Sequence, residues 1–283
     1  MRIASYNVQN LFDERDAGCN GALAKPQTAL KALAGTIGAL GADVILLQEV
    51  GSIDILDSVN DSLNTPYPFR AVLPGNSDRG IHLAIFSREP FQLTSHRDLT
   101  LTDPRGNALL EYGSEADAEA DRALPVRIQR DLMLAELDLA EQGALSLFNV
   151  HLKSKTNRPW RRLAADDIRA AEVRHVAARV SEYLATHADR PVILGGDFND
   201  LRSSEVLKPV FDLPLSDPMG ELLAVTGSNP STYWPKRRMR LDFLLLSSAA
   251  RASFVQDSAR IHASQRARRG SDHYPISVDL ELG

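Results

Sequence analysis

Several apolar runs of this sequence are followed at once by side chains that can bind a metal ion or a phosphate group. Glu49 follows the run 44–47, His151 follows 145–148, and Asp197 follows 192–194 and two glycines. Carboxylate oxygens are the ligands that Mg²⁺ and Mn²⁺ prefer. A single acidic residue at a strand end is usually a solvated surface residue, so each segment alone is a weak indication. Their recurrence predicts one site for metal or phosphate, built from segments 6–7, 48–49, 149–153, 196–199, 240–242 and 271–273.

The segment 195–200 carries two glycines, then Asp197, Phe198, Asn199 and Asp200. Paired glycines let a backbone turn tightly or approach a ligand closely. Asp197 and Asn199 alternate along the chain, so in an extended backbone both side chains point the same way. A carboxylate beside an amide can orient a water molecule and a phosphoryl oxygen. The alternative interpretation is a turn rich in Asp and Asn.

Two histidines stand beside charged residues. His273 follows Asp272, but adjacent residues of a strand point to opposite faces, so Asp242 is the expected partner of the imidazole. A carboxylate bonded to one ring nitrogen fixes the tautomer and raises the basicity of the ring. His151 has Lys153 two residues further on, on the same face of an extended chain. The remaining histidines lack such neighbours and are interpreted as structural or solvated: His82, His96, His175, His187 and His262.

The elements that position these residues are predicted mainly as strands. Short apolar runs bounded by turn residues predict buried strands at 2–8, 44–48, 81–87, 132–139, 145–152, 192–194, 241–246 and 276–282. Helical spacing of apolar residues predicts helices at 28–40 and 161–187. The acidic stretch 101–122 has no periodicity and is predicted to be a surface loop. With no repeat and no linker, residues 1–283 are expected to form a single domain. Two packed sheets with outer helices and an open α/β sheet both fit this pattern.

Composition limits the classes of function. The net charge is −5, so the chain has no global positive field for nucleic acid, and a polyanion must be held by local basic patches or through a metal. The one cysteine, Cys19, excludes an intramolecular disulfide and is expected to be an incidental thiol. No run approaches the about 18 apolar residues of a membrane span. The chain opens on a strand-like segment, so a cytoplasmic location is expected, although a secreted protein after signal removal would look the same.

Taken in order, the six segments resemble those of the endonuclease/exonuclease/phosphatase superfamily, and the likeness extends from residue 5 to residue 279. The superfamily includes DNase I-like nucleases, abasic-site endonucleases, inositol polyphosphate phosphatases and neutral sphingomyelinases. The resemblance implies an α+β fold, the four-layer α/β/β/α sandwich in which two mostly antiparallel sheets are flanked by helices. The segments that carry the resemblance are Tyr6-Asn7, Gln48-Glu49, Asn149-Val150-His151-Leu152, Gly196-Asp197-Phe198-Asn199, Arg240-Leu241-Asp242-Phe243 and Ser271-Asp272-His273.

The resemblance implies a metal site for Mg²⁺ or Mn²⁺. Glu49 would hold the ion, Asn7 would lie close by and bind metal or phosphate, and Asp272 would complete the metal environment. Gln9 stands where the similar bacterial nuclease-like proteins often have Glu and the abasic-site enzymes have Asp. One outer carboxylate is therefore missing, which puts the metal affinity in question and leaves the class unchanged.

The resemblance also implies catalytic roles. Asp197 would orient or deprotonate the attacking water, and Asn199 would fix the phosphoryl group. His273, oriented by Asp242, would contact the scissile phosphate or act as the acid–base group. His151 would stabilise phosphoryl oxygens or assist the leaving group. The water would attack in line, and no covalent enzyme intermediate is required.

Basic and aromatic residues gather beside these segments and are candidates for substrate binding. Such a rim suits a polyphosphate or a nucleic-acid backbone, with rings for base stacking; Lys and Arg side chains are also ordinarily just solvated. We expect a monomeric nuclease acting on DNA or RNA. The alternatives are a phosphatase or phosphodiesterase of a small or lipid-linked phosphoester, which the acidic total favours, and a non-catalytic binding module. The candidate substrate-binding residues are Lys153, Trp160, Arg161, Arg238, Arg240 and Arg269.

Overall fold

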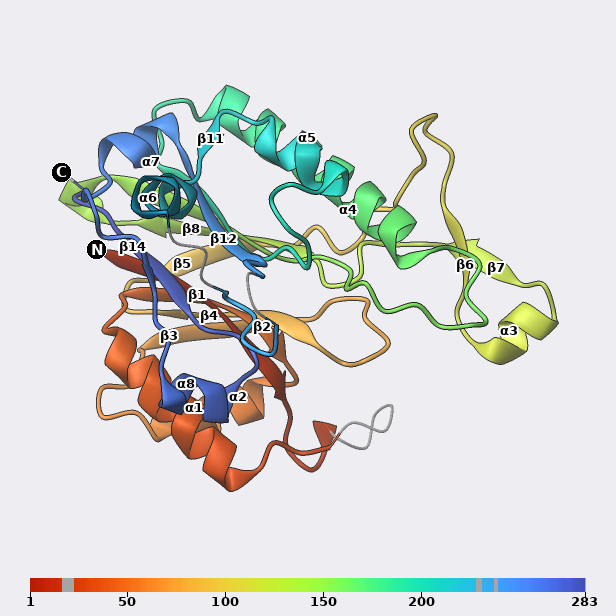
Figure 1. Cartoon of the computed structure of the whole chain (residues 1–283), viewed down its shortest axis with the longest axis horizontal. Helices are drawn as coiled ribbons and strands as arrows, with labels where there is room; N and C mark the ends of the chain where they lie inside the picture. Colours follow the sequence, from red (N-terminus) through yellow and green to blue (C-terminus); the bar gives the residue numbers. More distant parts are fainter. Residues whose placement is uncertain (17–22, 228–230, 237–238, 283) are drawn as a thin grey trace.

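Two six-stranded sheets packed face to face form the centre of the protein (Figure 1). The computed structural model describes residues 1–16, 23–227, 231–236 and 239–282, so Cys19 and Arg238 lie outside the described residues. The first sheet has the strand order β13 (Arg260–Ile261), β14 (Ile276–Asp279), β1 (Arg2–Leu11), β2 (Val44–Val50), β4 (His82–Ser87), β3 (Phe69–Leu73). The second has the order β11 (Leu215–Ser216), β12 (Asp242–Ser247), β10 (Val192–Asp197), β9 (Ala144–His151), β8 (Leu132–Asp138), β5 (Phe91–Thr94).

Strand β2 shows why continuous apolar runs form central strands here. Val44 and Leu46 pack into the core between the two sheets, whereas Ile45 and Leu47 pack into a second core under the helices. Because successive side chains of a strand point to opposite faces, a strand that is covered on both faces must be apolar at every position. The same alternation on β9 places Leu147 between the sheets and Phe148 under a helix.

Helices cover the outer face of each sheet and complete four layers (Figure 1). Helix α1 (Gln27–Leu40) ends at Gly41, whose φ of 56° is the left-handed conformation common after helices. It packs beside α2 (Ile53–Asp61) and α8 (Gln265–Gly270) on the first sheet. Helices α4 (Ala165–Thr186) and α5 (Lys208–Phe211) cover the outer face of the second sheet. Helices α6 (Pro218–Thr226) and α7 (Ser248–Ala252) contact β12 and pack Met219 and Ala250 into the core between the sheets. None of the described helices is both long and apolar enough to cross a membrane.

The predicted sandwich of two mostly antiparallel sheets is confirmed. Each sheet contains one parallel pair, β1–β2 in the first and β9–β10 in the second. The predicted surface loop at 101–122 is largely exposed but contains two short elements that were not predicted, β6 (Leu110–Tyr112) and α3 (Glu115–Glu119), and β6 pairs with β7 (Ala123–Pro125). These elements are three to five residues long, too short for a periodic pattern to reveal. They form the arm at the right of Figure 1.

A buried amide pair joins the two sheets. Gln48 on β2 donates from Nε2 to Oδ1 of Asn149 on β9 at 2.8 Å. Asn149 in turn donates from Nδ2 to the carbonyl oxygens of Leu47 at 3.0 Å and Ala84 at 3.3 Å. Buried polar groups of this kind fix one relative position of the elements they link, because any other position leaves them unpaired. Two residues of the sequence segments therefore hold the sheets in register beside the candidate site.

Candidate active site

Four strands from both sheets deliver the candidate residues to one edge of the sandwich. In the parallel pair β1–β2, Asn7 lies opposite Gln48, the residue before Glu49. In the parallel pair β9–β10, Asp197 lies opposite His151, the last residue of each strand. Parallel neighbours end at the same edge of a sheet, so each pair presents its polar residues together.

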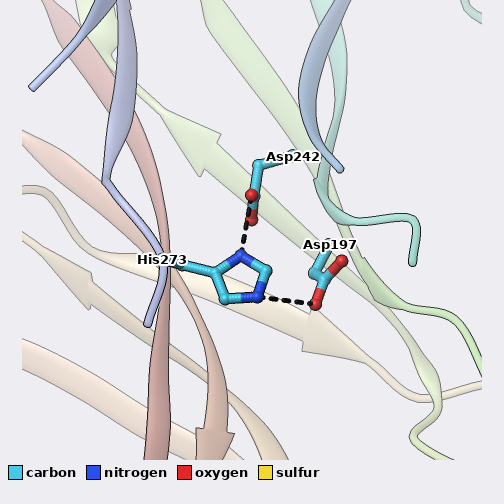
Figure 2. Close-up of side chains that lie close together, drawn as sticks. All are labelled: Asp197, Asp242 and His273. Carbon is cyan, nitrogen blue, oxygen red and sulfur yellow. Dashed lines mark hydrogen bonds and ion pairs between the residues drawn. The ribbon is translucent and has the colours of Figure 1, made fainter. Parts of the chain in front are cut away.

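Two further segments complete the edge. Asp242 on β12 lies opposite Asp197 in the antiparallel ladder. The segment before β14 is fixed by Ser271, whose hydroxyl donates to the carbonyl oxygen of Asn7 at 2.7 Å and whose Oγ accepts from the His273 amide at 3.1 Å. The sheet registers and this hydroxyl together bring His273 to Asp242 and Asp197 (Figure 2).

The backbone around Glu49 is irregular. The β1–β2 register shifts between Asn7 and Leu11, and the β2–β4 register shifts between Gln48 and Val50. Glu49 has a φ of 66° and Asn10 a φ of 46°. Left-handed backbone at residues other than glycine is costly and clusters at functional sites, and bulges redirect side chains there. The Asn10 amide donates to Glu49 Oε2 at 2.9 Å, so the distortion fixes the carboxylate.

The imidazole of His273 lies between two buried aspartates (Figure 2). Its Nδ1 is 2.8 Å from Asp242 Oδ2, and its Nε2 is 3.8 Å from Asp197 Oδ2. Burial alone lowers the pKa of His273, but the two aspartates outweigh burial and raise the pKa to about 10. Burial raises the pKa of Asp197 to about 7, against the opposing charge of His273. The expected pairing of His273 with Asp242 is present in the structure, although the catalytic roles of both residues remain predictions.

The second histidine, His151, has the opposite protonation behaviour. Its Nε2 lies 3.6 Å from Asp197 Oδ2 and 3.8 Å from Glu49 Oε1, and its Nδ1 is buried without a hydrogen-bond partner among the described residues. Burial lowers the pKa of His151 well below its usual value, and the positive charge of Arg130 adds to this shift. At neutral pH the site therefore holds a protonated His273 and a neutral His151.

Carboxylates and an amide make a donor set suited to a hard cation. Asn7 Nδ2 donates to Asp197 Oδ2 at 2.9 Å and lies 3.4 Å from Glu49 Oε1. Burial raises the pKa of Asp272, and the like charge of Glu49 raises it further. Two negative groups that repel one another in a partly buried site are what a divalent cation relieves. The residues expected to hold a metal ion therefore fit one.

A buried Asp/Asp/His cluster marks the same place by a different criterion. One ligand atom each of Asp197, Asp242 and His273 lies within 4.8 Å of the others, which suggests a divalent metal site. However, His273 Nδ1 is already bonded to Asp242, and Mg²⁺ takes oxygen ligands. The expected metal ligands Glu49 and Asp272 are not part of this cluster, and their role stays a prediction.

Asn199 reaches the site by a different geometry from the expected one. Its φ of 52° is left-handed, so the alternation of an extended strand does not apply beyond Asp197. The Asn199 amide donates to Asp197 Oδ1 at 2.8 Å, and its side-chain Nδ2 donates to the Leu152 carbonyl at 2.9 Å. The side-chain Oδ1 is left as a hydrogen-bond acceptor, which suits the attacking water and not a phosphoryl oxygen. The two preceding glycines, Gly195 and Gly196, lie within strand β10 and not in a turn.

The candidate substrate-binding residues separate into two groups. Trp160 is flanked by the guanidinium groups of Arg158 and Arg161, which lie 5.6 and 5.5 Å from its ring and pair with Asp78 at 2.9 and 3.5 Å. The other three candidates lie elsewhere or have protein partners. Lys153 is buried and donates to the carbonyl oxygens at 154 and 156, Arg240 pairs with buried Asp217, and Arg269 is exposed on α8.

Three basic residues near the carboxylates were not among the site residues predicted from the sequence. Arg79 donates to Asn10 Oδ1 at 2.6 Å, Lys25 donates to the Gln9 carbonyl at 2.6 Å, and Arg130 lies buried just before β8. The search for polar residues after apolar strands misses Arg130 because it precedes its strand. Lys25 and Arg79 belong to segments outside strands, where the spacing of residues does not show which way their side chains point.

Two sheets flanked by helices, with several carboxylates and two histidines at one edge, define a phosphoesterase of the DNase I-like fold. The chain belongs to the Endonuclease/Exonuclease/phosphatase family, which it matches over residues 4–273. A comparison with curated proteins finds no match.

Solved structures share the fold at low sequence identity. The human Nocturnin catalytic domain with bound sulfate has a TM-score of 0.63 and 18% identity, over 100% of this chain and 94% of that one. Truncated TDP2 from Caenorhabditis elegans has a TM-score of 0.60 and 18% identity, over 98% and 96%. The 3′ phosphatase NExo from Neisseria, bound to a product DNA hairpin, has a TM-score of 0.61 and 17% identity, over 99% of both chains.

Proposed function

We propose that this phosphoesterase is a divalent-metal-dependent nuclease that hydrolyses phosphodiester bonds of DNA or RNA. The observation that carries the chemistry is the convergence of Asp197 on Asn7, His151 and His273 at one sheet edge. The preference for a nucleic-acid substrate rests on Trp160 and the guanidinium groups of Arg158 and Arg161 near its ring, since an aromatic ring can stack a base and an arginine can bind a backbone phosphate. The DNA-bound relative from Neisseria supports the same substrate class.

The protonation states of the buried groups set their roles. Mg²⁺ or Mn²⁺, held by Glu49 and Asp272 with Asn7 beside them, would neutralise charge that develops on the phosphoryl oxygens. Asp197, with a pKa of about 7, is suited to accept a proton from the attacking water near neutral pH. His273, with a pKa of about 10, remains a cation that donates to the phosphoryl group.

The other two polar groups act without changing their charge. Neutral His151 can donate one hydrogen bond to a phosphoryl or leaving-group oxygen. Asn199 presents its Oδ1 while its Nδ2 is engaged by Leu152. Water attacks phosphorus directly as the leaving oxygen departs, with no covalent intermediate on the protein.

A second candidate function is hydrolysis of a small or lipid-linked phosphoester, and the net charge of −5 favours it because a long polyanion is repelled by an acidic protein. Basic groups near the site can attract a phosphate locally in spite of this net charge, which supports a nucleic-acid substrate. A non-catalytic binding module would be expected to lack one of Glu49, Asp197 or His273, and all three are present. A monomeric state and a cytoplasmic location stay predictions.

The decisive experiment compares hydrolysis of supercoiled plasmid, single-stranded DNA, RNA and bis-p-nitrophenyl phosphate with Mg²⁺ or Mn²⁺. A double variant, Asp197→Ala with His273→Ala, purified in parallel, reports contaminating nuclease. Metal-dependent cleavage of nucleic acid that disappears in the variant supports the nuclease. Turnover of the small diester alone, lost in the same variant, moves the substrate to small phosphoesters. No turnover of any substrate contradicts the proposal.

A further inference from the structure

We propose that Arg130 is a phosphate-binding residue of this site, whose guanidinium group donates to oxygens of the substrate's phosphoryl group. The inference deepens the proposed function, since it rests on this edge of the sandwich binding a phosphoester. Arg130 lies two residues before the start of β8 and is 3% exposed. Its Nε and Nη1 atoms have no hydrogen-bond partner among the described residues. No carboxylate of those residues lies within ion-pair distance of it.

The β8–β9 ladder brings the segment of Arg130 to the strand end that carries His151, because Leu132 lies opposite Val150. Burial lowers the pKa of Arg130, and this shift is opposed by the carboxylates of Glu172, Glu49 and Asp197. Among charged groups, Arg130 lowers the pKa of His151 most. The guanidinium is therefore within electrostatic reach of Glu49 and Asp197, and it makes no ion pair with either among the described residues.

The backbone that carries Arg130 is held firmly, in contrast to its unpaired side chain. Glu172 on α4 accepts from the Gln129 amide at 3.1 Å and from the Lys153 amide at 2.7 Å, fixing the segments on both sides of the site. A Cβ atom on Gly75 would meet Arg130 Cα at 2.8 Å, so the segment between β3 and β4 packs directly on this backbone. The fold thus positions an arginine at the site and supplies no partner for two of its donors.

An anion is the missing partner. A buried guanidinium stays protonated, and leaving its donors without acceptors is unfavourable. A divalent cation bound by Glu49 would weaken the attraction between that carboxylate and Arg130. A phosphoryl group restores the balance, since the planar fork of a guanidinium matches two of its non-bridging oxygens. Arg79, which is 3.9 Å from Glu49 Oε2, adds positive charge beside the same site.

The competing explanation is a structural cation that neutralises buried Glu172. The geometry argues against it, because the two backbone amides already satisfy Glu172 and no ion pair joins it to Arg130 among the described residues. The explanations differ in their effect on stability. Removing a structural partner of a buried carboxylate destabilises a protein strongly, whereas removing an unpaired buried charge does not.

The test uses Arg130→Met, which keeps the length of the side chain and removes the charge. Binding of inorganic phosphate is measured by calorimetry in the presence of Mg²⁺, together with the thermal midpoint of unfolding. We expect phosphate affinity to fall at least about tenfold, as for loss of one charged hydrogen-bonding group. The thermal midpoint should stay unchanged or rise. Arg260→Met, on the exposed edge strand β13, is the matched control and should change neither quantity.

Every outcome decides between the explanations. A folded Arg130→Met variant with wild-type phosphate affinity overturns the proposal, as does a wild-type protein that binds no phosphate. If Arg130→Met does not fold, Arg130→Lys is measured instead, since it keeps the charge and loses the fork; unchanged affinity there overturns the proposal too. A protein that binds phosphate through Arg130 but cleaves no nucleic acid refutes the nuclease and leaves this inference standing. Full nuclease activity in Arg130→Met refutes this inference and leaves the nuclease standing.

Discussion

Replacing Gly196 by alanine should disturb the protein more than replacing its neighbour Gly195. Gly196 lies in β10 next to Asp197, and its φ is 136°, a conformation open to glycine and strained for residues with a Cβ atom. An added Cβ atom would lie 2.0 Å from the carbonyl oxygen of Val150 on the adjacent strand β9. Because that oxygen belongs to the backbone, no side-chain rotation relieves the clash.

The magnitude follows from two costs. Strained backbone at a residue other than glycine costs about 1–3 kcal/mol, and forcing an extra methyl into a packed core costs about 1–3 kcal/mol more. We expect Gly196→Ala to lower the free energy of unfolding by roughly 2–6 kcal/mol, the sum of these ranges. For a chain of this size that corresponds to a thermal midpoint lower by about 2 °C for each kcal/mol.

Two other glycines separate the contributions. A Cβ atom on Gly195 would meet the side-chain atoms Leu244 Cδ2 at 2.6 Å and Leu46 Cδ1 at 3.1 Å, which can move, so only the packing cost of about 1–3 kcal/mol applies. Gly227 has a φ of 64° and open space around it, so its alanine variant measures the backbone cost alone. Urea unfolding followed by circular dichroism gives all three values. The reasoning is refuted if Gly196→Ala is no more destabilised than Gly195→Ala.

Three further predictions concern the site directly. Asp242→Asn should lower the pKa of His273 from about 10, seen by NMR of the imidazole, and reduce turnover about 10²–10⁴-fold; an unchanged pKa would contradict the pairing. Asp78→Asn should raise the affinity for a fluorescent single-stranded oligonucleotide about twofold to tenfold in an anisotropy titration, because Asp78 competes with phosphate for Arg158 and Arg161; a weaker complex would show that Asp78 orders these arginines instead. Chelating divalent ions should abolish hydrolysis, and Mg²⁺ at about 100 times its dissociation constant should stabilise the metal-free protein by about 2.7 kcal/mol in a thermal-shift assay; no shift would argue against a metal site.

The fold was predictable to the extent that strands are continuous and apolar. Runs such as 44–48 and 145–152 lie where the sequence predicts, because each is covered on both faces and so is apolar throughout. Strands β3 and β5 were missed, since they lie at sheet edges, where exposure mixes polar residues into the pattern. The arm containing β6 and α3 was missed because its elements are shorter than a pattern window.

The site was predictable where the argument depended on strand ends, and less so where it depended on local geometry. Asn7, His151, Asp197 and Asp242 meet because sheet registers bring strand ends together. The direction of Asn199 was not predictable, since alternation fails once the backbone turns left-handed. The charge of an arginine did not show whether it binds substrate or pairs within the protein. Arg240 was a candidate for substrate binding, but it pairs with Asp217, which is 23 residues away in sequence.

The charge of the whole chain says less about the substrate than the separation of charge within the site. Glu49, Asp272 and Asp197 make one side negative, while Arg130 and Arg79 make the adjoining side positive. Buried charges act on one another through a medium of low polarisability and are screened little by salt, whereas the scattered surface charges that sum to −5 are screened within about 10 Å. Under the proposed function, a phosphodiester that reaches this edge would meet a cation site and an arginine side by side. The acidic total of the chain therefore does not argue against a polyanionic substrate at this edge.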